Sequence, residues 1–120
     1  MIPIIRISRV ENGIKKIAVL VLKGPLTGSA TGEFLRMAAE KILQERDRHL
    51  VINLSCVSDV DDNGVRVLLS AYTMARDKSR ECVLSSLSEN IKNTSQMPKL
   101  LTVFDIFETD EEATNIVASR

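Results

Sequence analysis

The chain is poor in aromatic residues, which make up 3% of its 120 residues and include no tryptophan. Few rings are therefore present on which the bases of a single-stranded nucleic acid could stack. Cysteines are also scarce: Cys56 and Cys82 are the only two, too few for a disulfide framework or a four-thiolate zinc site. Each lies in or beside an apolar run, so we expect both to be buried and unreactive.

An excess of charge is missing too, because 16 basic residues balance 16 acidic ones. The bulk attraction that draws basic proteins to nucleic acids or anionic membranes is thus absent. No apolar run approaches the roughly 20 residues that span a bilayer, and the N-terminus does not resemble a signal peptide. We therefore expect a cytoplasmic protein that neither binds nucleic acid nor inserts into a membrane.

What the chain does contain is typical of one globular domain, with 44% hydrophobic and 27% charged residues and no repeat or linker. A single domain is expected over residues 1–120. A chain of this length can bury a core without help from metals or disulfides.

Strand and helix patterns alternate along the chain. Strands are predicted over residues 4–10, 17–22, 50–54, 82–84 and 103–106. A turn at 11–13 joins the first two strands, and Gly24 and Pro25 are expected to end the second. This order predicts an α/β fold, whose mixed sheet has a mostly parallel core and an antiparallel N-terminal hairpin.

About four helices are expected between and after these strands. The first begins among the cap-type residues 27–30, the second after Gly64, a short third runs from Ser88 to Pro98, and the last follows Thr109. Helical spacing predicts which apolar side chains face the core: Phe34, Leu35, Ala38 and Ile42; then Val65, Leu68, Leu69, Tyr72 and Ala75; and finally Ala113, Ile116 and Val117.

An acidic segment, Asp59 to Gly64, stands between a predicted strand and the second helix. The carboxyl ends of strands are where α/β proteins tend to place functional residues. A cap on the helix by Asp62 or Asn63 accounts for one acidic residue. It does not account for Asp59, Asp61 and Asp62 together, so this segment is the candidate functional site.

Metal and enzymatic readings of the segment are disfavoured. The residues from Asp59 to Gly64 match the opening of an EF-hand loop, but Ser70 stands where a bidentate Glu is needed. A phosphoryl-transfer site would need further acidic side chains to hold a metal cation. The end of the earlier strand, Lys23-Gly24-Pro25, has no acidic residue. The single histidine, His49, is expected at the surface. We therefore expect neither a metal or cofactor nor an enzyme.

Three stretches resemble the STAS domain, and more narrowly the anti-sigma factor antagonists of bacterial partner-switching systems. They are Leu22-Lys23-Gly24-Pro25-Leu26, residues 51–58 (Val-Ile-Asn-Leu-Ser-Cys-Val-Ser) and Asp61-Asp62-Asn63-Gly64-Val65. The resemblance covers nearly the whole chain and implies a STAS-like fold. It also implies a transcription regulator that works by protein–protein interaction with an anti-sigma factor, itself a serine kinase.

In that family the kinase phosphorylates the Ser that follows the Asp of an Asp-Ser-Ser/Thr-Gly turn, and the phosphate blocks partner binding. Carried over by position, Asp61 and Gly64 match, whereas Asp62 falls on the phosphoacceptor Ser and Asn63 on the second Ser or Thr. A carboxylate cannot accept the phosphate. Asp62 carries one permanent negative charge where phosphoserine would carry about −1.5 to −2. The hypothesis is a STAS module without the serine switch. Such a module is either fixed in a state resembling the phosphorylated one, with Asp62 as a phosphomimetic, or it binds a partner with a compensating basic patch.

The resemblance also outlines a binding surface. Its centre is the turn Asp59, Asp61, Asp62, Asn63 and Gly64, with Lys23, Thr27 and Arg66 as neighbours. Arg66 can equally be a solvated residue that pairs with a local acid. Ser58 and Ser55 are the substitute phosphorylation sites nearest the turn, and each is also ordinary as a strand-end or turn residue. Asn53 stands where the family often has Asp.

Two other functions stay open at this point. A small-molecule-binding STAS module would hold its ligand in a pocket near the same turn. A STAS subunit of a membrane transporter complex would rely on the transporter for its place at the membrane. The identity of the partner and the oligomeric state cannot be derived from the sequence.

Overall fold

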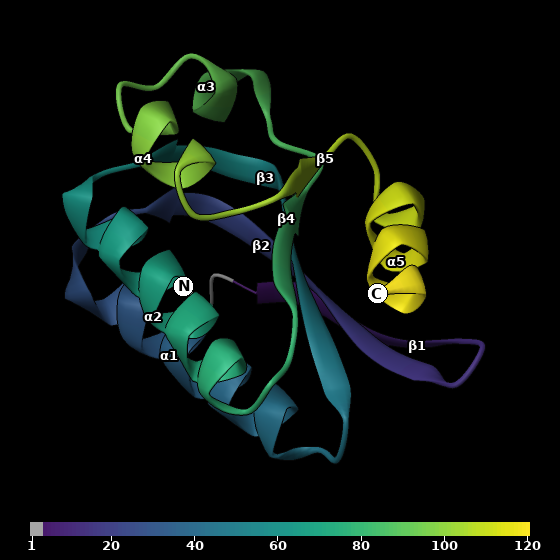
Figure 1. The fold of residues 1–120 in the computed structure, drawn as a ribbon. Helices are drawn as coiled ribbons and strands as arrows, with labels where there is room; N and C mark the ends of the chain where they lie inside the picture. Colours follow the sequence, from purple (N-terminus) through teal and green to yellow (C-terminus); the bar gives the residue numbers. More distant parts are fainter. Residues whose placement is uncertain (1–3) are drawn as a thin grey trace.

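The computed structural model describes residues 4–120. Its elements are β1 (Ile4–Asn12), β2 (Lys15–Leu26), α1 (Gly28–Gln44), β3 (Arg48–Val60), α2 (Asp62–Asp77), β4 (Cys82–Ser85), α3 (Glu89–Lys92), α4 (Met97–Leu101), β5 (Ile106–Phe107) and α5 (Asp110–Ser119). The strands form one sheet in the order β1-β2-β3-β4-β5. β1 is antiparallel to β2 and every other pair is parallel. The predicted α/β fold with a mixed sheet is confirmed (Figure 1).

Part of the N-terminal expectation concerns residues 1–3, which lie outside the described residues. The side chains of residues 5 and 28–31 lie outside them as well, and these include cap-type residues expected at the start of α1. Thr27 is the N-cap residue of α1, without a side-chain hydrogen bond to the helix. Within residues 4–120, no helix combines the length and apolar character needed to cross a bilayer.

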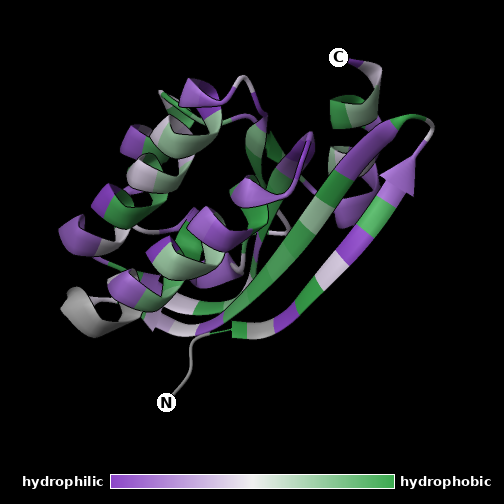
Figure 2. Ribbon diagram, turned by 90° about the horizontal axis from the view of Figure 1, so that it is seen from below, coloured by the Kyte–Doolittle hydropathy of each residue, from purple (hydrophilic) through white to green (hydrophobic). Residues whose placement is uncertain are grey.

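Helices cover both faces of the sheet. α1 and α2 lie side by side on one face, and α5 lies on the other (Figure 1). Strand β2 is buried from both sides: Ala18, Leu20 and Leu22 belong to the core under α1 and α2, whereas Ile17, Val19 and Val21 belong to the smaller core under α5. Alternation between the two faces explains the continuous apolar run of this strand. Hydrophilic residues gather on the outer sides of α1 and α2 (Figure 2).

The expected end of β2 at Gly24 and Pro25 is wrong, because the strand continues to Leu26. Gly24 has a φ of 74°, a left-handed conformation that glycine adopts without strain. The pairing register with β3 shifts between Val21 and Lys23 and again between Gly24 and Pro25. A glycine and a proline at an irregularity in the ladder bend a strand without ending it.

Some expected core positions are also wrong. Phe34 and Ile116 are exposed, at 43% and 37% of their surface. Leu69 and Tyr72 are partly buried but pack against the core, as expected. The buried stripes of the two long helices lie slightly to one side of the predicted ones and include Ala39, Leu43 and Ala71. Apolar periodicity locates a helix face only to within about one residue, since an apolar side chain at its border can stay exposed.

The segment expected as one short helix contains two, so the described residues hold five helices instead of about four. Ser88 caps α3 by accepting a hydrogen bond from the backbone N–H of Ile91. Pro98 does not end a helix but lies in the first turn of α4, where its missing N–H leaves no bond unmade. The last strand is also shorter than predicted, and Phe104 instead packs edge-to-face on Tyr72.

The two cysteines and the histidine differ from expectation in part. Cys82 is buried, which raises the pKa of its thiol to about 12, but Cys56 is exposed. His49, expected at the surface, is only 9% exposed. Strand β3 begins at Arg48, so His49 already lies inside the sheet beside the start of β4.

Candidate functional site

The acidic turn connects β3 to α2 at the carboxyl end of the parallel strands. Pairing of β2 with β3 places Pro25 opposite Asp59 and Leu26 opposite Val60. The connection from β2 to α1, which includes Thr27, therefore lies beside the turn, as the sequence predicted. Lys23 lies before this connection, within β2, where it pairs with Cys56 of β3. Its side chain is exposed, and that of Thr27 is partly buried.

Asp61 is the residue that caps α2. Its side chain accepts a hydrogen bond from the backbone N–H of Gly64 at 2.8 Å, and its carbonyl oxygen accepts one from Val65 at 3.0 Å. The expected cap by Asp62 or Asn63 is thus wrong by one or two positions, because the helix begins at Asp62. An aspartate at the N-cap satisfies one of the helix's free N–H groups and interacts favourably with the helix dipole.

Gly64 holds the first turn of α2 tightly against the end of β2. A Cβ atom at this position would lie 2.1 Å from the carbonyl oxygen of Leu26 and 2.6 Å from a methyl carbon of Val60. No other residue fits there unless the backbone moves. The N–H of Asp61 also donates to the same Leu26 oxygen, at 3.4 Å. The backbone of the turn is therefore fixed from both sides.

The carboxylates of Asp59 and Asp62 are exposed and have other partners. Asp59 accepts a hydrogen bond from the N–H of the next residue, Val60, at 2.8 Å. Asp62, whose side chain is 70% exposed, accepts one from the Nζ of Lys99 at 2.9 Å. The three carboxylates of the turn thus point to three different partners. Among the described residues no group of three such side chains is arranged to hold a metal ion.

Lys99 is a neighbour of the turn that sequence reasoning missed. It lies on α4, in the segment expected to follow the end of a helix. Its hydrogen bond and its positive charge lower the pKa of Asp62, and a hydrogen bond from Gln96 adds to the effect. Asp62 is therefore fully ionised at neutral pH, with a cation beside it. No local pattern in the sequence could have revealed a partner 37 residues away.

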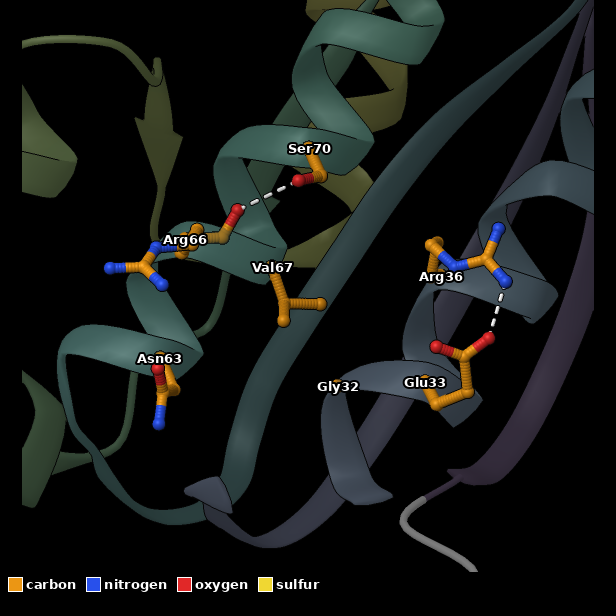
Figure 3. Close-up of a pocket in the computed structure, with 7 residues that line it drawn as sticks. All are labelled: Gly32, Glu33, Arg36, Asn63, Arg66, Val67 and Ser70. Atoms are coloured by element: carbon orange, nitrogen blue, oxygen red, sulfur yellow. Dashed lines mark hydrogen bonds and ion pairs between the residues drawn. The ribbon is translucent and has the colours of Figure 1, made fainter. Parts of the chain in front are cut away.

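Arg66 and Asn63 border a shallow groove between α1 and α2 (Figure 3). The groove measures about 250 Å³ and continues along both helices as far as Arg36 and Ser70. Arg36 is held by Glu33 and Glu40 of its own helix, whereas Arg66 forms no ion pair with the described residues. The expected pairing of Arg66 with a local acid is therefore absent among them.

Side chains of β3, β4 and α5 form a polar cluster where these three elements meet. The side-chain amide of Asn53 donates to Asp110 at 2.8 Å, and the hydroxyl of Ser85 donates to the same oxygen at 2.6 Å. The amide oxygen of Asn53 accepts from both the N–H and the hydroxyl of Ser55. An aspartate at position 53 would have no N–H for Asp110, which explains why this chain has Asn there.

Ser55 and Ser58, the substitute phosphorylation sites, are both exposed on the last part of β3. The hydroxyl of Ser55 is already bound to Asn53, at 2.6 Å. Of the two, Ser58 lies closer in sequence to the acidic turn. No structural feature distinguishes either residue as a phosphorylation site.

Comparison with known proteins identifies the fold. The family model of the STAS domain matches residues 9–113. A Thermotoga maritima protein described as an anti-sigma factor antagonist has 18% identity and a TM-score of 0.73, over 85% of this chain and 87% of its own. The antagonist SpoIIAA in its unphosphorylated form has 19% identity and a TM-score of 0.70, and the match covers 96% of this chain and 98% of SpoIIAA. The murine Slc26a9 anion transporter, at 17% identity, has a TM-score of 0.69 over 87% of this chain but 18% of the transporter.

Proposed function

We propose that this chain, which belongs to the STAS domain family, is a non-enzymatic regulator of the anti-sigma factor antagonist type. Its partner would be an anti-sigma factor that is also a serine kinase, in the cytoplasm of a bacterium. One observation carries the proposal: an exposed carboxylate, Asp62, occupies the first position of a helix whose first turn is held in place. This is the position that the family resemblance assigns to the phosphorylated serine.

The turn is well suited to docking a partner protein. The Asp61 cap and the contact of Gly64 with Leu26 fix its backbone. The side chains of Asp62 and Asn63 remain exposed on the fixed backbone. A rigid surface loses little conformational entropy when a partner binds, which raises affinity.

The charge of the turn supports permanent binding over permanent inhibition. Phosphoserine carries about −1.5 to −2 charges, whereas Asp62 carries one. The ammonium group of Lys99 lies 2.9 Å from that carboxylate and offsets part of its charge. The turn therefore presents less negative charge than a phosphorylated serine would, and we propose that the partner binds it whether or not ATP is present.

The test measures binding to an anti-sigma factor that is also a serine kinase, for the wild type and for Asp62→Ser. The wild type should bind equally well before and after incubation with the kinase and ATP, and take up no stoichiometric phosphate. The Asp62→Ser variant should bind, accept one phosphate and then be released. Mass spectrometry and a pull-down record both properties.

Ser58→Ala is the matched control, because it removes the nearest alternative hydroxyl and leaves the turn unchanged. Stoichiometric phosphate on wild-type protein that disappears in Ser58→Ala would contradict the missing switch. A failure of both wild type and Asp62→Ser to bind any anti-sigma factor would contradict the proposed function itself.

One further candidate function has specific support. The likeness to part of the Slc26a9 anion transporter is comparable in TM-score to that of the antagonists. A role as a STAS subunit of a transporter complex predicts that the tagged protein sediments with membranes and recovers a transporter. Recovery of a soluble anti-sigma factor instead would favour the antagonist role.

A further inference from the structure

A pocket with a polar lining lies at the amino end of the parallel strands, opposite the acidic turn. It measures about 350 Å³, and its polar lining is formed by Lys15, Asp47, His49, Lys78, Ser79 and Arg80. The connections from α1 to β3 and from α2 to β4 lie together at this end of the sheet (Figure 1). The lining residues thus come from the ends of several elements, and none belongs to the acidic turn.

Arg80 is anchored by the backbone around the pocket. Its Nη1 donates to the carbonyl oxygens of Glu45 and Arg48, at 2.9 and 2.8 Å. A guanidinium group has five N–H donors in a fixed plane. No hydrogen bond within the described residues uses the Nε or Nη2 of Arg80. The anchored group therefore keeps donors for an acceptor in the pocket.

His49 contributes a neutral donor. Its Nδ1 accepts a hydrogen bond from the N–H of Glu81 at 2.9 Å, so in the neutral ring the proton lies on Nε2. Burial lowers the pKa of His49, as do the charges of Lys15 and Arg80, while Glu81 and Asp47 act in the opposite direction. The imidazole is therefore uncharged at neutral pH, with an N–H to donate.

Positive charge exceeds negative charge at the pocket. The acidic neighbours have partners outside it: Asp47 lies 3.7 Å from Arg46, and Glu81 lies 2.7 Å from Arg120. In the described part of the chain, neither Lys15 nor Lys78 takes part in an ion pair. Two ammonium groups are thus left without a counter-charge.

We propose that this pocket binds a phosphate group, either as free phosphate or on a small phosphate monoester. Two ammonium groups, a guanidinium group and an imidazole N–H provide the charge-assisted hydrogen bonds that phosphate oxygens accept. A volume of about 350 Å³ lies within the range of small-ligand sites. The site is independent of the partner-binding turn, and its failure would leave the proposed function intact.

The test uses His49, the only histidine of the chain, as a nuclear magnetic resonance probe. The protein is titrated with inorganic phosphate and, separately, with phenyl phosphate, at constant ionic strength. Both should shift the imidazole signals in a saturable manner, and the bound anion should raise the pKa of His49. Equal affinities identify free phosphate as the ligand chemistry, and tighter binding of phenyl phosphate identifies the monoester.

Substitutions show whether the binding occurs in this pocket. Lys15→Ala and Lys78→Ala should each weaken phosphate binding about tenfold, as expected for loss of one charge-assisted hydrogen bond. Lys16→Ala removes the same charge from the adjacent strand position, which does not line the pocket, and should leave the affinity unchanged. Amide spectra of all three variants should show the native fold.

Four results would overturn the proposal. The first is the absence of a saturable shift at His49 with either phosphate compound. The second is an equal response to sodium nitrate at the same ionic strength. The third is a loss of affinity in Lys16→Ala as large as in Lys15→Ala. A response to anionic lipid vesicles, with none to phosphate, would also reject the small-molecule site in favour of a membrane surface.

Discussion

The two ends of the parallel strands differ in the charged groups that they expose. At the carboxyl end, the turn of Asp59 to Gly64 exposes carboxylates, whereas at the amino end Lys15 and Lys78 border a pocket. The net charge of zero hides this separation. Overall composition therefore says little about the local surfaces that a partner or ligand meets.

Hydrogen-bonded polar groups also lie at both ends of the strands. Asn53 and Ser85 bind Asp110 at the carboxyl end. His49 and Arg80 bind backbone groups at the amino end. Groups that lose contact with water must be hydrogen-bonded, while exposed charges are free to recognise a partner. The following changes test how much the contacts at each end contribute to stability.

The largest effect is expected at the carboxyl end, from Gly64→Ala. The new Cβ would lie 2.1 Å from the carbonyl oxygen of Leu26, so the helix start or the end of β2 must move. We expect a loss in the free energy of unfolding of about 3 kcal/mol, at the upper end of overpacking effects. Urea denaturation followed by circular dichroism measures it.

Asn63→Ala is the control for this change, because it alters the neighbouring exposed side chain of the same turn. Its effect should stay within about 0.5 kcal/mol. Equal urea midpoints for Gly64→Ala and the wild type would show that the turn is not held against β2, and the contrast between a fixed backbone and free side chains would be lost.

An intermediate effect is expected from Asn53→Asp, which places a second carboxylate against Asp110. The hydrogen bond of 2.8 Å between positions 53 and 110 would be replaced by repulsion. We expect the free energy of unfolding to fall by about 1–3 kcal/mol at pH 7. This loss shrinks at lower pH, because one of the carboxyl groups becomes protonated.

The double variant Asn53→Asp with Asp110→Asn restores one amide and one carboxylate to the pair. It should regain most of the stability at pH 7, in the manner of a double-mutant cycle. If the single variant is as stable as the wild type at pH 7, the hydrogen bond between positions 53 and 110 does not stabilise the fold.

The smallest effect is expected at the amino end, from the titration of His49. Its pKa is lowered in the folded protein, mainly by burial, so below the unfolded value of about 6.5 the unfolded chain binds more protons. Stability should therefore fall as the pH drops through about 6.5 towards the lower, folded pKa. Thermal melts between pH 5 and pH 8 measure the slope.

His49→Asn removes the titrating imidazole, so its stability should vary less with pH over the same interval. An unchanged slope in this variant would assign the pH dependence to other groups.

Local patterns in the sequence were enough to predict much of the fold. The order of strands and helices along the chain, the antiparallel hairpin and the place of the acidic turn follow from periodicity and turn residues over short windows. The same windows misplaced the end of β2, because a glycine followed by a proline is compatible both with a strand end and with a bulge inside a strand. They also missed the burial of His49, which depends on the neighbouring strand.

The sequence by itself determined the order of the strands and amphipathic helices along the chain and the place of the acidic turn, since these depend on neighbours a few positions apart. Only the tertiary structure decided what those residues contact. It brings Lys99 to Asp62 and Asp110 to Asn53, pairs that are 37 and 57 residues apart. It also gathers Lys15, His49 and Lys78 into one pocket. Such contacts arise from the packing of whole elements, and no short stretch of sequence encodes them.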